Sequence, residues 1–137
     1  MRYQLLESRR DEALLAARIL LMILFVIFGW SKLTNFSSTT GYMGAEGLPL
    51  PAVAAVVVIA MELVVGVALL LGFYTRPLAL LLAVYTLAAA LIGHDNWTMT
   101  GADRAANVIN FYKNISIVGG LLLLGVTGAG KFSIDGK

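Results

Sequence analysis

Two ionisable residues lie well inside long apolar stretches of the chain, far from their ends. Glu62 falls in the segment 52–73 and Lys113 in the segment 106–126. If these segments cross a membrane, Glu62 lies ~15 Å deep and Lys113 roughly 10 Å deep, measured from the same face. A charge at the centre of a span costs at least ~2.5–3.5 kcal/mol, so each needs a partner or a function. We expect an ion pair or a shared polar chamber, although a pair could also serve only to fix helix register.

Three amides share the helical face of Lys113. At 100° per residue, Asn107, Asn110 and Asn114 fall within about a third of the helix circumference. Such a stripe can hydrogen-bond a carbonyl group or a file of water molecules. It can also simply hold helices together, at ~0.6 kcal/mol per contact.

Arg18 lies about one turn inside the first apolar segment. It can extend to the lipid headgroups, as long cationic side chains do near span ends. Alternatively, because Arg18, Met22, Phe25, Gly29 and Lys32 follow helical spacing, it faces the bundle and pairs with Glu62.

His94 and Asp95 are adjacent at the end of the third apolar segment. A histidine beside a carboxylate can relay protons, whereas a histidine bonded to a loop is the simpler alternative. The other carboxylates are scattered, so we expect no metal site. The chain has no cysteine and one histidine, which excludes thiol chemistry, cysteine-ligated clusters and bis-histidine haem within one chain.

The composition places these residues in lipid. The 137 residues are 59% hydrophobic and 13% charged, with a mean hydropathy of +0.85. Soluble domains carry ~45–50% apolar and ~25% charged residues, and a soluble protein this small could not bury so much apolar surface. The net charge of +2, with no basic cluster interleaved with aromatic residues, excludes a nucleic-acid partner.

Four apolar segments approach the ~20 residues that cross a bilayer. We predict an all-α, four-helix transmembrane bundle forming a single integral membrane domain over residues 1–137, because isolated strands leave backbone groups unpaired in lipid. The spans are 13–33, 52–73, 77–93 and 106–126.

The basic residues predict the orientation of the spans. One side would hold Arg2, Arg9, Arg10, Arg76, Lys131 and Lys137. The other side would hold Lys32, near the end of the first span, and Arg104, so both termini should face the cytoplasm. In the first outer loop we expect a short interfacial helix, capped by Ser37 or Ser38 and continuing through Gly44.

Several motifs together resemble the DoxX family of small four-span bacterial membrane proteins. They are Gly29-Trp30-Ser31-Lys32-Leu33, Gly41-Tyr42-Met43, Gly47-Leu48-Pro49, Glu62 with Gly66, Leu71-Gly72-Phe73-Tyr74-Thr75-Arg76, and Asn110-Phe111-Tyr112-Lys113-Asn114 ahead of Gly119-Gly120. Within the family, Ile92-Gly93-His94, Trp97-Thr98-Met99-Thr100-Gly101 and Ser133-Ile134-Asp135 are similar to inner membrane proteins of enterobacteria.

This resemblance implies a location in the bacterial inner membrane and a link to quinone-dependent oxidoreductase systems. It marks Lys32, Glu62, Arg76 and Lys113 as family-pattern positions without giving any of them a catalytic role. We expect either a non-metal subunit or accessory of such a system, with a quinone near Glu62, Lys113 and Asn110 and electrons from a partner subunit, or a non-enzymatic scaffold whose charges only fix helix packing. No covalently bound cofactor is expected, and the sequence does not indicate an oligomeric state.

Overall fold

The structure is a computed structural model that describes residues 5–137. The described residues contain helices and no strands, which confirms the predicted all-α class. In chain order the elements are η1 (Glu7–Arg9), α1 (Arg10–Thr34), α2 (Phe36–Ala45), α3 (Pro51–Ile59), η2 (Ala60–Val64), α4 (Val65–Leu71), α5 (Thr75–Gly93), η3 (Asn96–Thr98) and α6 (Gly101–Thr127).

Four helices are long and apolar enough to cross a membrane, as predicted. They cover Glu7–Thr34, Pro51–Leu71, Thr75–Thr98 and Gly101–Thr127. The second span is continuous through α3, η2 and α4, and Pro51 occupies its first turn, where a missing N–H costs nothing. Arg2, which contributed to the predicted orientation, lies outside the described residues.

Helix α2 forms in the connection between the first and second spans, but not with the predicted cap. It begins at Phe36, directly after Asn35, so both serines lie inside the helix. The Asn35 side chain instead donates to the carbonyl of Ser31 at the end of α1. The position of α2 relative to the bilayer surface stays a prediction.

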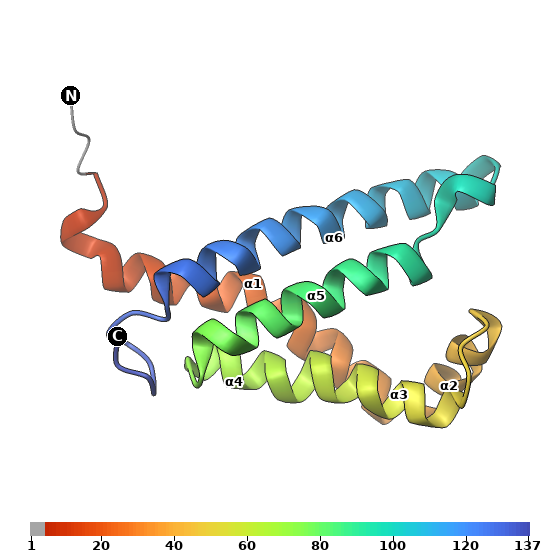
Figure 1. Ribbon diagram of the computed structural model, residues 1–137, viewed down its shortest axis with the longest axis horizontal. Coiled ribbons are helices and arrows are strands. Elements are labelled where there is room, and N and C mark those ends of the chain that lie inside the picture. The colour runs from red at the N-terminus through yellow and green to blue at the C-terminus, as the bar shows by residue number, and fades with distance from the viewer. Residues whose placement is uncertain (1–4) are drawn as a thin grey trace.

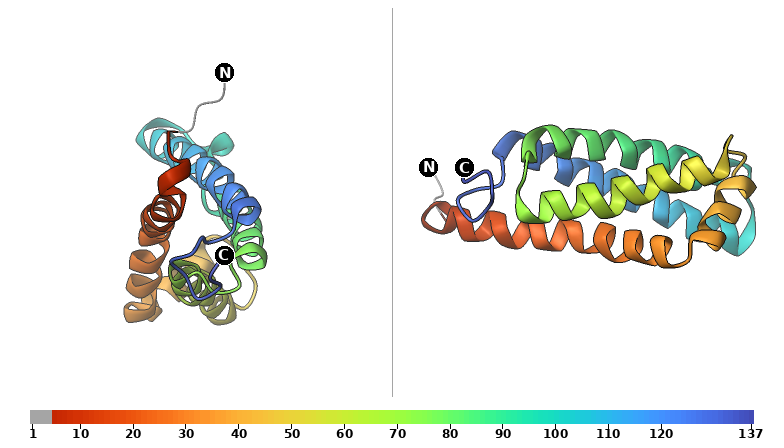
Figure 2. Two further views of the ribbon diagram at one scale, coloured as in Figure 1. Left: turned by 90° about the vertical axis from the view of Figure 1, so that its left-hand side faces the viewer. Right: turned by 90° about the horizontal axis from the view of Figure 1, so that it is seen from below.

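The spans pack as two pairs, α1 with the second span and α5 with α6 (Figure 1). Gly29 brings α1 close to η2, since a Cβ there would lie 2.7 Å from the backbone nitrogen of Leu63. The buried core joins the pairs through Met22, Phe25, Leu69, Ala79, Leu82, Ala83, Leu121 and Leu124. Helix α2 packs across one end of the bundle, opposite the C-terminus (Figure 2).

We call the end that holds the C-terminal segment 128–137 the closed end. Arg18 is 1% exposed there, and its guanidinium donates to the carbonyls of Leu70 (2.6 Å), Ala129 (3.1 Å) and Phe132. Carbonyls at a helix C-terminus lack intrahelical partners, so a cation there satisfies them. Arg18 therefore faces the bundle, as the second alternative predicted, but its partners are backbone carbonyls and not Glu62. The prediction that its side chain extends to the lipid headgroups was wrong.

The C-terminal segment also lies against the connection between α4 and α5. The backbone N–H groups of Ile134 and Asp135 donate to the carbonyls of Leu71 (3.0 Å) and Gly72 (2.9 Å). The Asp135 carboxylate accepts from the backbone N–H groups of Tyr74 (2.9 Å) and Thr75 (2.8 Å). It thus caps α5 from 60 residues away along the chain.

Candidate functional site

Glu62 lies in the π-helical segment η2, in the middle of the second span. The Val65 N–H bonds to the Ala60 carbonyl, five residues back, so the helix is one residue wider here. Short π-helical segments inside helices often occur at functional sites. The widened turn places the carboxylate of Glu62 between α1 and α5, and the residue as a whole is 8% exposed.

Each oxygen of this carboxylate has its own donor from a different span. The Lys32 ammonium on α1 lies 2.5 Å from Oε1, and the Tyr85 hydroxyl on α5 donates to Oε2 over 2.5 Å. Glu62 therefore joins three of the four spans. The side chain of Lys32 is 32% exposed and that of Glu62 is 10% exposed, so the pair is partly screened on the lysine side.

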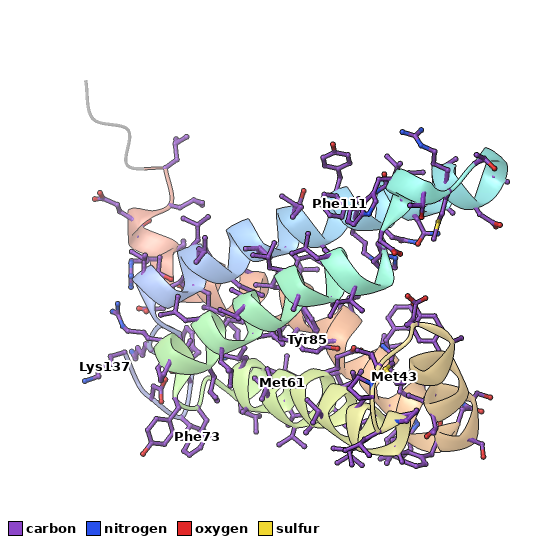
Figure 3. All side chains as sticks on the ribbon, turned by 45° about the vertical axis from the view of Figure 1, so that its right-hand side comes forward. Met43, Met61, Phe73, Tyr85, Phe111 and Lys137 are labelled. Carbon is purple, nitrogen blue, oxygen red and sulfur yellow. The ribbon has the colours of Figure 1, made fainter. Side chains whose placement is uncertain are left out.

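A cavity of about 430 Å³ lies beside these residues, at what we call the open end of the bundle. The second span and the α5–α6 pair diverge toward this end (Figure 1), and Tyr85 lies on the side of α5 that faces the second span (Figure 3). Polar groups on the wall come from Lys32, Tyr42, Glu46, Glu62, Tyr85, Thr86, His94, Lys113 and Asn114. Much of the remaining wall is apolar and includes Leu24, Phe25, Phe28, Met43 and Val58.

The predicted ion pair between Glu62 and Lys113 is not formed. Lys113 is exposed, and its ammonium lies 3.4 Å from Oδ1 of Asn110, one turn away on the same helix. Lys113 and Glu62 nevertheless line the same cavity. Lys32 is the cation that reaches Glu62, because its helix packs directly against η2 whereas α6 packs mainly against α5.

The other predicted site residues divide between cavity and surroundings. Asn114 is 9% exposed and lines the cavity, whereas Asn110 contacts it only through Lys113. His94 lines the cavity, and its Nδ1 lies 3.0 Å from the side-chain oxygen of Asn107. A relay through His94 and Asp95 stays a prediction.

Arg18 and Arg76 lie at the closed end, away from the cavity. Arg76 donates to the carbonyls of Val126 and Thr127 at the end of α6. The family-pattern position Arg76 thus joins the ends of α5 and α6 instead of contributing to the cavity.

Sequence reasoning missed Tyr85, which donates the hydrogen bond to the second carboxylate oxygen of Glu62. A signal was present, because Tyr85 and Thr86 are the polar residues within the otherwise apolar segment 77–93. Tyr42 and Glu46 were also missed, since nothing in the loop sequence shows that this segment packs against the cavity.

Comparison with known proteins identifies the family of the chain. The DoxX family model matches residues 13–95, a range that includes Lys32, Glu62 and Tyr85. The chain belongs to the DoxX family. This membership confirms the resemblance found in the motifs. The matched range covers most of the first three spans.

Two full-length relatives of this DoxX chain are inner membrane proteins of Escherichia coli. Inner membrane protein YphA is 45% identical over 135 residues, covering 98% of this chain and 96% of the relative. Inner membrane protein YqjF is 41% identical over 133 residues, covering 95% of each. No solved structure matches the chain. With the four apolar helices, these relatives identify a multi-pass inner membrane protein.

Proposed function

We propose that this DoxX-family protein binds the headgroup of an isoprenoid quinone in the cavity at the open end. It would act as a non-metal subunit or accessory of a quinone-linked oxidoreductase system, with both termini in the cytoplasm. The observation that carries the proposal is the set of Lys32, Glu62 and Tyr85 in the wall of a cavity of about 430 Å³ within the spans.

The size and the lining of the cavity suit such a ligand. Small-molecule sites usually enclose about 300–1,000 Å³, with apolar walls and a few polar groups that fix orientation. Phe25 and Phe28 supply apolar wall for a ring. Lys113 is exposed and lines the cavity, so a ligand can approach past it from outside the bundle.

The polar residues of the wall supply hydrogen-bond donors and proton acceptors, among which Glu62 is bonded to both Lys32 and Tyr85. Carbonyl oxygens of a headgroup accept hydrogen bonds, and the ammonium groups of Lys32 and Lys113 carry only donors. Glu62 can take up a proton at a carboxylate oxygen, which weakens its pairing with Lys32. A bound quinone would supply two-electron, two-proton redox chemistry, with the electrons exchanged by a partner subunit.

The test is purification in mild detergent followed by mass spectrometry for ubiquinone and menaquinone. We expect quinone to co-purify with the wild-type protein. Less quinone should co-purify with Glu62→Gln and with Tyr85→Phe. The matched control is Tyr112→Phe, because Tyr112 is 63% exposed on α6 and does not line the cavity. Absence of quinone from wild-type protein, or equal loss in the control, would contradict the proposal.

A scaffold is the second candidate. Two observations favour it: the Lys32–Glu62 pair already joins α1 to the second span, and Gly119 is exposed, so that a Cβ added there would meet no atom within 4 Å. A partner helix could then approach α6 at this glycine. In that case Gly119→Leu should abolish co-purification of a partner protein, while Glu62→Gln should leave it bound.

A further inference from the structure

We propose a second ligand site: an anionic phospholipid binds in the groove between α1 and α6 at the closed end, with its phosphate at Arg10. This site is separate from the quinone cavity and does not depend on the proposed function. The two helices make few direct contacts with each other, and side chains of both line the groove; their ribbons overlap in this part of the view in Figure 1.

The groove has the shape and lining of an acyl-chain site. Its volume is about 550 Å³. The lining residues are Leu14, Ala17, Arg18, Leu20, Leu21, Gly120, Leu123, Leu124 and Thr127. Along α6 it runs from Gly120 to Thr127, about 10 Å at the helical rise. The guanidinium of Arg18 is occupied by backbone carbonyls, so the groove is chemically apolar over its length.

Two exposed guanidiniums meet at the end of this groove. Arg10 and Arg76 both donate to the carbonyl of Thr127, over 3.4 Å and 3.5 Å, and Thr127 lines the groove. Neither guanidinium forms an ion pair with a carboxylate of the described residues. Each side chain keeps donors unused by these contacts, since a guanidinium has five.

This combination selects the occupant by charge. Both α1 and α6 have their span ends here, so the guanidiniums lie at the level of the headgroups. Basic pockets between transmembrane helices bind anionic headgroups, and each arginine near the surface contributes about 1 kcal/mol. A zwitterionic lipid has the same chains but lacks the net charge, so the two arginines favour the anionic one.

The experiment is a titration of delipidated protein in detergent with dioleoyl phosphatidylglycerol, followed by native mass spectrometry. Dioleoyl phosphatidylcholine serves as the uncharged comparison. We expect the wild-type protein to prefer phosphatidylglycerol, and Arg10→Gln to weaken its binding about fivefold. The matched control is Arg9→Gln, because Arg9 already pairs with Glu12 over 3.4 Å; its effect should stay below about twofold.

A second pair of variants tests the groove itself. Ala17 is exposed and lines the groove, whereas its neighbour Ala16 is exposed and does not. Ala17→Trp should fill the groove and reduce phosphatidylglycerol binding, and Ala16→Trp should not. Equal binding of the two lipids, or equal effects of Arg9→Gln and Arg10→Gln, would overturn the proposal. It would also be overturned if the wild-type protein showed no lipid preference and formed a dimer that Ala17→Trp dissociates, because the groove would then bind a second copy of the chain.

Discussion

At the closed end Arg18 is bonded to backbone carbonyls, whereas at the open end Lys32 is paired with a side-chain carboxylate that faces a cavity. Both cations lie on the same face of α1. The carbonyls that hold Arg18 are fixed by the ends of α4 and the C-terminal segment. The carboxylate that holds Lys32 belongs to a side chain that lines the cavity. A buried cation is therefore structural when its partners are backbone groups, whereas a cation paired with a side chain in a cavity wall is placed where a ligand can contact the pair.

The largest expected effect is at the closed end. Arg18→Met should destabilise the protein by roughly 3 kcal/mol or more, because it leaves buried carbonyls of α4 and of the C-terminal segment without donors. Thermal unfolding in detergent measures this change. Arg18→Lys should recover only part of the stability, since a single ammonium cannot reach the same spread of carbonyls. Equal stability of wild type and Arg18→Met would remove the structural role assigned to this end.

The next effect concerns the ion pair at the open end. Lys32→Met should cost roughly 2 kcal/mol, because Glu62 would keep a buried charge with Tyr85 as its remaining donor. The double variant Lys32→Met with Glu62→Gln should recover most of this loss, since neither group is then charged. Unfolding of the four proteins of the double-mutant cycle gives the coupling energy. Additive effects of the two substitutions would show that the pair is not coupled.

A smaller effect is expected at the cap of α5. Asp135→Ala should cost about 1 kcal/mol, the usual loss when a capping carboxylate is removed. Burial raises the pKa of Asp135. Hydrogen bonds from Thr75 and Tyr74 and the charge of Lys137 together lower it by more than burial raises it, so the pKa of Asp135 lies below the usual value. Its contribution is therefore present above the usual aspartate pKa of ~3.9 and is lost as the pH falls through the lowered value. The check is acid titration of stability, in which Asp135→Asn should lack this step.

The smallest effect should come from Lys113. Because its ammonium contacts only Asn110 and the residue is exposed, Lys113→Gln should change stability by less than ~0.5 kcal/mol. The same thermal unfolding assay applies. A loss as large as that of Lys32→Met would mean that Lys113 and not Lys32 neutralises Glu62.

The sequence was sufficient for the spans but not for the pairing of charges. Apolar length predicts the four helices, and the cost of a charge in lipid marks Glu62 and Lys113 as residues to explain, whereas Lys32 was marked only by the family resemblance. Depth along a helix axis, however, does not say which helices are neighbours. Glu62 was matched to Lys113 by depth, whereas the close approach at Gly29 places α1, and with it Lys32, beside η2.

Arg18 shows a second limit of sequence reasoning. Its partners are carbonyls of α4 and of the C-terminal segment, and backbone groups leave no signature in side-chain patterns. The π-helical segment η2 was also not predictable, because the residues Ala60–Val64 carry no breaker that distinguishes them from an ordinary helical turn.

The most direct test of a ligand site at the open end is photolabelling of the protein in proteoliposomes with an azido-quinone, followed by peptide mapping. The proposed quinone site predicts labelled residues on the cavity wall, on α5 near Tyr85 and on α2 near Met43, with labelling lost in Glu62→Gln. Labelling mainly in the groove at the closed end, or labelling of the cavity wall that Glu62→Gln leaves unchanged, would contradict it.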